Sequence, residues 1–214
     1  MFVEDLLDLP LREVMSILHR RIMQGTMYQG VFTYKWPPDA WMYQEILWRC
    51  RPDLIIEIGT KFGGSALFLA DTMRAADYEG HVLTIDVDQS RVADLARLND
   101  RIALYQGDAS APATVKHVRQ FVHLVGAQKV MVIEDSAHTY PVTLACLREY
   151  GPLVASGQYF IVEDAMMCKA HNRGDRGPLE AMETFLEENS ADWAVDRDME
   201  WPITCNARGY LRRV

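Results

Sequence analysis

Three carboxylates in this sequence are placed to bind a hard metal ion. Asp135 and the pair Glu163-Asp164 each follow a short apolar run of the kind that forms a buried strand. Neighbouring parallel strands end at the same edge of a sheet, so these side chains are expected to converge. Oxygen donors suit Mg²⁺ or Mn²⁺ better than zinc. The sequence therefore predicts a divalent-cation site made by Asp135, Glu163 and Asp164.

His138 lies three residues after Asp135 and is a candidate general base. An imidazole titrates near neutral pH, so it can take a proton from a hydroxyl group that the cation orients. The alternative is a histidine that only completes the packing. Without a cation, three clustered acids would repel one another and raise one another's pKa, which disfavours a purely structural cluster. We expect Asp135 and His138 to be catalytic.

A second candidate site is the glycine-containing turn at 59–65. A dinucleotide fingerprint would need a glycine at Lys61, and a phosphate-binding P-loop would need a lysine directly before Ser65. What remains is an acid, Glu57, two residues before Gly59 and a loose pair of glycines after it. This pattern resembles the first motif of class I S-adenosylmethionine-dependent methyltransferases, although a strand–helix unit whose glycines only serve packing is the alternative. The residues expected to bind the cofactor here are Glu57, Gly59, Thr60, Gly63 and Ser65.

Two further acids at strand ends suit a nucleoside. Asp86 ends the second strand of the predicted sheet, where a carboxylate can accept hydrogen bonds from both ribose hydroxyls. Asp108 follows the third strand and could accept the adenine amino group. The alternative for Asp86 is a helix cap, and Asp88 reads better as a cap or turn residue.

The elements that must position these residues alternate between strands and helices. Such alternation predicts an α/β fold with a mostly parallel, seven-stranded Rossmann-like sheet and helices on both faces. We expect an N-terminal extension of helices and an aromatic arm at 1–51 and one globular domain at 52–214. Strands are predicted at 54–58, 82–86, 102–105, 130–133, 159–162, 193–195 and 203–206. Predicted helices include 4–24, which Pro10 could break or start, and 90–98, capped by Ser90, and 166–177 is expected to be a loop.

The segment 28–39 is aromatic, contains prolines and lacks a regular pattern. Such a segment can lie over a site as a lid or substrate wall. An N-terminal arm that packs on the core or on another subunit is an equal alternative.

Composition limits the function classes. The chain has 214 residues, with 22 Lys and Arg against 30 Asp and Glu, so a net charge of −8 argues against general nucleic-acid binding. Four scattered cysteines without C-x-x-C spacing argue for a reducing cytosol rather than a disulfide framework. No apolar run approaches the ~20 residues that span a bilayer. We expect a cytoplasmic protein with no membrane partner.

Together these segments resemble the cephalosporin hydroxylase/rhamnosyl O-methyltransferase family, a branch of the class I methyltransferases. The resemblance runs from about residue 28 to the C-terminus. It rests on 38–39 with 43–47, 51–57, 63–70, Glu134-Asp135-Ser136, His138-Thr139, 160–164, Asn206 and 209–213.

The resemblance implies a methyltransferase sheet, S-adenosylmethionine, a divalent metal and a homo-oligomer. It also implies that Asp135, Glu163 and Asp164 hold the metal and that His138 is the base. Several relatives carry a second acid where this chain has Ala137, which leaves His138 or solvent to take the proton.

The expected function is metal-dependent methylation of a hydroxyl on a sugar or other natural-product acceptor, as in antibiotic biosynthesis. An iron oxygenase needs two histidines and a carboxylate, and His138 has only His171, in a predicted loop, as a weak partner. A chain with this fold could instead serve as a non-catalytic methyltransferase-fold subunit or as a hydroxylase component.

Overall fold

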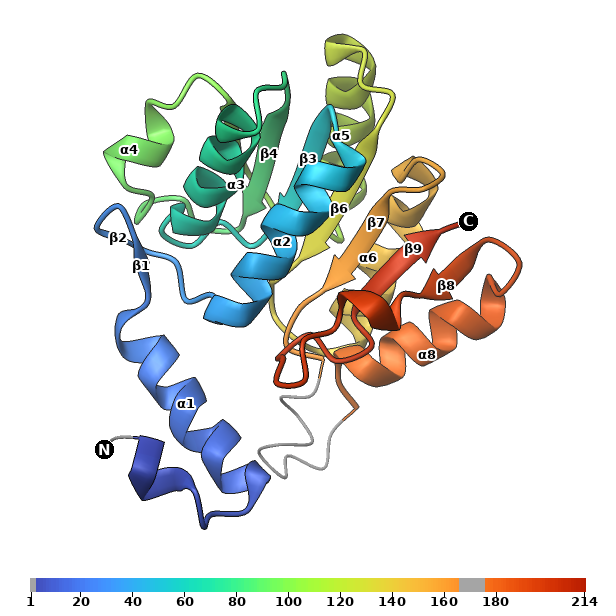
Figure 1. Cartoon of the computed structure of the whole chain (residues 1–214). Helices are drawn as coiled ribbons and strands as arrows, with labels where there is room; N and C mark the ends of the chain where they lie inside the picture. The colour runs from blue at the N-terminus through green and yellow to red at the C-terminus, as the bar shows by residue number, and fades with distance from the viewer. Residues whose placement is uncertain (1–2, 166–175) are drawn as a thin grey trace.

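The structure is a computed structural model that describes residues 3–165 and 176–214 (Figure 1). Its central feature is a seven-stranded sheet of order β5-β4-β3-β6-β7-β9-β8. From β5 to β7 neighbouring strands are parallel, whereas β9 runs antiparallel to both β7 and β8. The strands are β3 (Leu54–Ile58), β4 (His81–Asp86), β5 (Ile102–Gln106), β6 (Val130–Glu134), β7 (Tyr159–Val162), β8 (Trp193–Val195) and β9 (Tyr210–Arg213).

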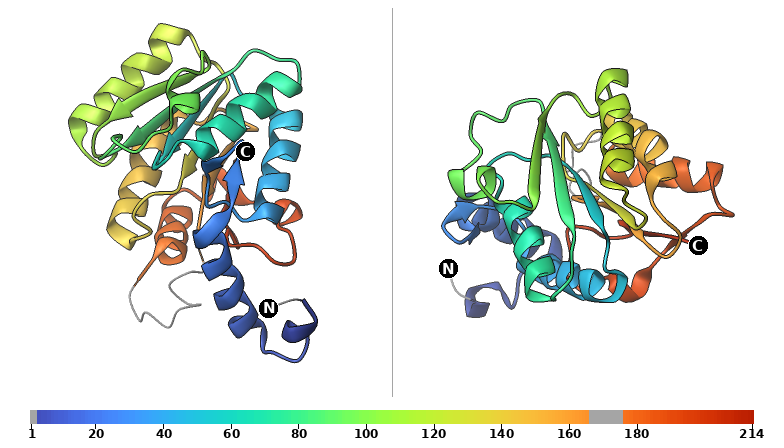
Figure 2. Two further views of the ribbon diagram at one scale, coloured as in Figure 1. Left: turned by 90° about the vertical axis from the view of Figure 1, so that its left-hand side faces the viewer. Right: turned by 90° about the horizontal axis from the view of Figure 1, so that it is seen from above.

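Helices cover both faces of this sheet, as Figure 2 shows. On one face, α2 (Pro37–Cys50) and α3 (Gly64–Ala75) pack against Ile55 and Ile133. On the other face, α5 (Pro112–Val125), α6 (Tyr140–Tyr150) and α8 (Pro178–Glu188) pack against Ile56 and Val132. Alternate residues of one strand therefore enter two different cores, which is why the central strands are mostly apolar, with Glu57 of β3 and Glu134 of β6 as buried exceptions. The predicted α/β class and mostly parallel sheet are confirmed.

The strand order reverses between β3 and β6, since β4 and β5 lie on one side of β3 and the later strands on the other. Loops leaving the carboxyl ends of strands part at such a position and leave room for a ligand. The turn after β3 and the loop after β6 both start there. The sheet thus brings the glycine turn and Asp135 to one place.

The N-terminal part contributes a helix and an arm. A 3₁₀ turn, η1 (Val3–Leu6), precedes α1 (Leu11–Gly25), and the hairpin of β1 (Met27–Tyr28) and β2 (Val31–Phe32) follows. The two-residue turn Gln29-Gly30 has positive φ at both positions, as tight hairpins prefer. In Figure 1, α1 extends away from the body of the sheet, while the arm returns the chain to α3.

Two predicted elements are wrong in position, and a third is divided at Pro10. The helix expected at 4–24 is interrupted, because Pro10 starts α1 rather than continuing η1. The helix expected at 90–98 is only α4 (Asp94–Arg97), preceded by Ala93 and not capped by Ser90. The strand expected at 203–206 is absent among the described residues, and β9 lies at Tyr210–Arg213 instead. The remaining 3₁₀ turns are η2 (Gly151–Leu153) and η3 (Arg197–Met199).

Most of the predicted loop at 166–177, with His171 and Cys168, lies outside the described residues. Cys50, Cys146 and Cys205 are free thiols. Within 3–165 and 176–214, none of the helices combines the length and apolar character needed to cross a bilayer.

Candidate active site

A cavity of about 540 Å³ lies at the carboxyl ends of the central strands. Its volume falls in the range typical of small-molecule sites, roughly 300–1,000 Å³. The glycine turn, the ends of β4 and β5, the loops after β6 and β7, the arm and α1 all contribute to its walls. Five of the seven predicted cofactor residues line it: Gly59, Thr60, Ser65, Asp86 and Asp108.

The other two predicted cofactor residues lie behind the cavity wall. Glu57 is fully buried, and its Oε2 accepts a hydrogen bond of 2.6 Å from Thr84 Oγ1, which is itself 2.8 Å from Thr60 Oγ1. Burial raises the pKa of Glu57, opposed by the Lys35 charge and by the hydrogen bond from Thr84. This carboxyl group therefore supports the turn from below through Thr84 and Thr60.

Gly63 is required by the fold of the turn. It precedes α3 with φ +82°, and a Cβ there would lie 2.6 Å from the Cβ of Ala96. At Gly64 a Cβ would lie 2.4 Å from the carbonyl oxygen of Phe32. The glycine pair therefore lets α4 and the arm approach the start of α3, while Gly59 and Thr60 face the cavity.

The two acids predicted to bind a nucleoside both line the cavity. Asp86 Oδ2 accepts the backbone N–H of Lys61 at 2.8 Å, and its Oδ1 accepts that of Asp88 at 3.1 Å. Asp108 Oδ1 accepts the N–H and the hydroxyl of Ser110 at 2.8 and 2.7 Å. These bonds orient both carboxylates at the rim, with lone pairs left for a ligand.

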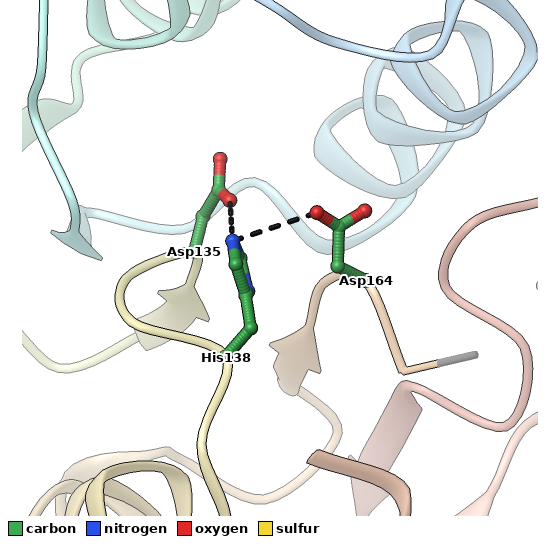
Figure 3. A group of neighbouring side chains, drawn as sticks. All are labelled: Asp135, His138 and Asp164. Carbon is green, nitrogen blue, oxygen red and sulfur yellow. Dashed lines mark ion pairs between the residues drawn. The ribbon is translucent and has the colours of Figure 1, made fainter. Parts of the chain in front are cut away.

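A cluster of Asp135, His138 and Asp164 lies on the same cavity (Figure 3). His138 Nε2 is 3.6 Å from Asp135 Oδ1 and 3.5 Å from Asp164 Oδ2. One ligand atom from each of the three residues lies within 4.8 Å of the others, close enough for one cation to bind all three. Burial and the charge of Asp135 raise the pKa of Asp164, which His138 and His19 of α1 oppose.

Glu163, the third predicted metal ligand, lines the cavity but is occupied by other groups. Its Oε1 accepts hydrogen bonds from Lys35 Nζ and, at 2.7 Å, from Tyr43 Oη. Burial and the charge of Asp135 raise the pKa of Glu163, whereas Lys35 and Tyr43 oppose this. The structure brings Asp135 and Asp164 together with His138, and it places Glu163 beside Lys35.

Sequence reasoning missed Lys35, Tyr43 and the part that Asn206 plays here. Asn206 Nδ2 donates to Tyr43 Oη at 3.1 Å, and its Oδ1 accepts the N–H of Asp164 at 3.2 Å. A chain of contacts from α2 and the C-terminal segment therefore holds the loop after β7. The one available signal was that Lys35 is the only charged residue in the aromatic run 28–36.

Strained backbone surrounds the cavity. Tyr34, Lys61, His138 and Asp164 all have φ between +49° and +53°, a region that side chains with a Cβ rarely adopt. Such conformations persist where the surrounding structure holds them, and they concentrate at functional sites. All four line the cavity.

The arm forms an aromatic wall of the cavity. The rings of Phe32, Tyr34 and Phe62 lie 5.6–5.7 Å apart, and Lys61 Nζ lies 4.4 Å from the Tyr34 ring centre. Tyr28 of the arm also packs edge-on against Phe68 of α3. The two interpretations of this segment, cavity wall and packed arm, therefore both hold.

Comparisons with known proteins show the family of this chain. The model of the rhamnosyl O-methyltransferase/CmcI family matches residues 20–214. The chain is 33% identical over 197 residues to the rhamnosyl O-methyltransferase of Mycobacterium leprae, which covers 90% of this chain and 85% of that protein. It is 32% identical over 193 residues to the enzyme of the same name from Mycobacterium tuberculosis H37Rv, with 88% and 78% covered.

Solved structures give the same result. A structure of CmcI with Mg and SAM superposes with a TM-score of 0.72 at 27% identity, covering 88% of this chain and 76% of that one. An O-methyltransferase from Bacillus cereus with SAH superposes with a TM-score of 0.57 at 18% identity over 99% and 94% of the two chains, a likeness of fold. The chain therefore belongs to the rhamnosyl O-methyltransferase/CmcI family of S-adenosylmethionine-dependent O-methyltransferases.

Proposed function

We propose that this enzyme transfers a methyl group from S-adenosylmethionine to a hydroxyl of a sugar or other natural-product acceptor, with the help of a divalent cation. One observation carries the proposal: the Asp135–His138–Asp164 cluster and the glycine turn with Asp86 open into one cavity. A group that activates a hydroxyl and a group that holds a methyl donor thus face the same space.

The cofactor would lie along the ends of β3 to β5. Asp86 would accept hydrogen bonds from the ribose hydroxyls, and Asp108 would accept one from the adenine amino group. The methionine part would lie against Gly59, Thr60 and Ser65, where the turn brings backbone close to the ligand. Glu57 and Gly63 would act from behind the wall by fixing the shape of this turn.

The donor set fits a hard divalent cation. Asp135 and Asp164 offer carboxylate oxygens at the cavity, which suit Mg²⁺ or Mn²⁺. Glu163, the third predicted ligand, adds negative charge beside them while its Oε1 accepts from Lys35 and Tyr43. When bound, the cation would supply the charge that orients an acceptor hydroxyl and favours loss of its proton.

His138 would take the proton of the acceptor hydroxyl. Its Nε2 lies between the two aspartates and lines the cavity. Ala137 offers no acid beside it, so the imidazole is the base that this loop provides. S-adenosylmethionine, when bound, would supply the methyl group to the acceptor oxygen and leave as S-adenosylhomocysteine. The residues of the cavity would contribute mainly by holding donor and acceptor close together.

The acceptor would approach past the arm and α1. Phe32, Tyr34, Trp36 and Met23 form an apolar and aromatic wall, while His19 adds a polar group. Such a wall suits the face of a sugar ring or a scaffold attached to it. The protein would form a homo-oligomer, which sedimentation tests, and act in the cytoplasm, which fractionation of the source cells tests.

Calorimetry tests the proposal first. S-adenosylmethionine is titrated into the protein with Mg²⁺ and with a chelator, and Mg²⁺ is titrated into the protein alone. Binding of both, followed by methylation of hydroxylated sugars detected by mass spectrometry, is the expected result. Cofactor binding without cation binding would remove the metal from the mechanism, and binding of neither would favour a non-catalytic subunit.

A further inference from the structure

The ammonium group of Lys35 is a buried cation inside the acidic cluster. Lys35 Nζ donates to Asp135 Oδ2 at 2.6 Å and to Glu163 Oε1, and only 3% of its side chain is exposed. Burial alone would lower its pKa, but the charges of Asp135, Glu163 and Glu57 outweigh burial and raise it. Lys35 therefore forms a buried ion pair with both carboxylates.

The residues on both sides of Lys35 are held in fixed positions. Tyr34 before it has left-handed backbone with φ +53°, and Trp36 after it donates its indole N–H to the carbonyl of Ile203 at 3.0 Å. Thr33 N–H donates a hydrogen bond to the carbonyl of Thr26 at 3.0 Å and so closes the base of the β1–β2 hairpin. The arm is thus fixed on both sides of the lysine.

Lys35 divides the carboxylate oxygens into two sets. Asp135 Oδ2 and Glu163 Oε1 face the ammonium group, while Asp135 Oδ1 and Asp164 Oδ2 face His138. The second set belongs to the group of ligand atoms that one cation can reach. When ionised, the three carboxylates and the ammonium group carry a formal charge of −2, which one divalent cation balances.

We propose that Lys35 is a positioning residue that acts as a resident countercation: it holds Asp135 and Glu163 in place without metal and confines the divalent-cation site to the Asp135 Oδ1 and Asp164 side. The part of this inference that concerns metal affinity rests on the proposed function. The part that concerns the metal-free protein does not.

Lys35→Met tests both parts, with Lys116→Met as the control. Lys116 is exposed on α5, so its variant removes one positive charge outside the cluster. In chelator, Lys35→Met should lower the melting temperature by on the order of 10 °C, because it leaves buried carboxylates without a partner. Mg²⁺ should bind Lys35→Met about tenfold more tightly, since two oxygens and one net negative charge are freed. Lys116→Met should change neither quantity.

A charge-balanced variant keeps the test decisive if Lys35→Met does not fold in chelator. Lys35→Met combined with Glu163→Gln restores the charge of −2 and keeps an oxygen to accept from Tyr43. It should recover at least half of the lost melting temperature. No recovery, or a single variant as stable as the parent protein, would overturn the countercation role.

An unchanged Mg²⁺ affinity in Lys35→Met would overturn the confinement of the cation site and leave an ordinary buried ion pair. If the parent protein binds no Mg²⁺, the proposed metal use fails. The melting temperatures in chelator then decide the role of Lys35 by themselves.

Discussion

Gly59 and Asp135 meet backbone to backbone: a Cβ built on Gly59 would lie 2.0 Å from the carbonyl oxygen of Asp135. Asp135 N–H also donates to the carbonyl of Ile58 at 2.8 Å. The turn expected to hold the cofactor and the loop that carries the acidic cluster are therefore one packed unit. A substitution that moves the backbone at Gly59 is therefore expected to displace Asp135 as well.

Gly59→Ala should disrupt this unit. The new methyl group clashes with backbone, which cannot move aside as a side chain can, and φ of +107° adds strain. We expect a loss of more than about 3 kcal/mol in the free energy of unfolding, measured by urea denaturation. Gly126→Ala is the matched control: φ is +66° but nothing lies within 4 Å of its Cβ, so about 1 kcal/mol is expected. Equal losses in the two variants would contradict the clash.

Asp86→Asn should weaken S-adenosylmethionine binding. The amide oxygen can still accept from Lys61 N–H, so the turn is kept, but a charged acceptor for the ribose hydroxyls is lost. Hydrogen bonds to charged groups contribute about 1.5–3 kcal/mol, which predicts roughly a tenfold to hundredfold rise in Kd by calorimetry. Asp88→Asn, outside the cavity lining, should leave Kd within about twofold. If both variants bind as the parent does, Asp86 has no role in cofactor binding.

His138→Ala and Asp164→Asn should separate the base from the cation site. Loss of the base should reduce kcat by about 10²–10⁴-fold with Mg²⁺ binding retained, because the carboxylates remain. Asp164→Asn should reduce both turnover and Mg²⁺ affinity. The measurements are kcat with saturating substrates and a Mg²⁺ isotherm for each variant. If His138→Ala loses the cation instead, the imidazole is a ligand and not the base.

Asp39→Asn should reduce the pH dependence of the free energy of unfolding between pH 4 and 6. Asp39 is buried and accepts bonds from Thr204, Cys205 N–H and Tyr210, and burial raises its pKa to about 6. Since the pKa of an aspartate in the unfolded chain is about 4, Asp39 keeps its proton to a higher pH in the folded state than in the unfolded state. The contribution of Asp39 therefore falls by up to about 3 kcal/mol as pH rises from about 4 to 6.

The measurement for Asp39 is urea unfolding of the parent protein and the variant at several pH values. The difference in unfolding free energy should shift toward the variant as pH rises and level off above about pH 6. Parallel curves would show that Asp39 does not titrate in this range. Burial also raises the pKa of other acids, among them Glu57 and Glu163, so the diagnostic quantity is the difference between the two proteins.

The errors of the sequence-based prediction have local physical causes. Before the segment 90–98, the Gln89 side chain donates hydrogen bonds to the carbonyls of Thr84 and Tyr105. The Arg97 side chain donates to the carbonyl of Gln89. These contacts hold the chain in an irregular conformation, and only α4 forms. At the C-terminus, the arginine-containing tail forms β9 because Tyr210 and Leu211 are buried while Arg212 points outward. Pairing with β7 and β8 supplies the bonds that a propensity argument cannot see.

The sequence by itself determined the α/β class, the central strands, the glycine turn and the acids at the strand ends. Those signals are local: apolar runs mark strands buried on both faces, and a parallel sheet brings their ends together. Only the tertiary structure decided which side chains contact these acids. Lys35 is 100 residues from Asp135 and 128 from Glu163, and Tyr43 is 120 from Glu163. No spacing rule links such positions, because the packing of the arm and α2 on the finished sheet brings them into contact.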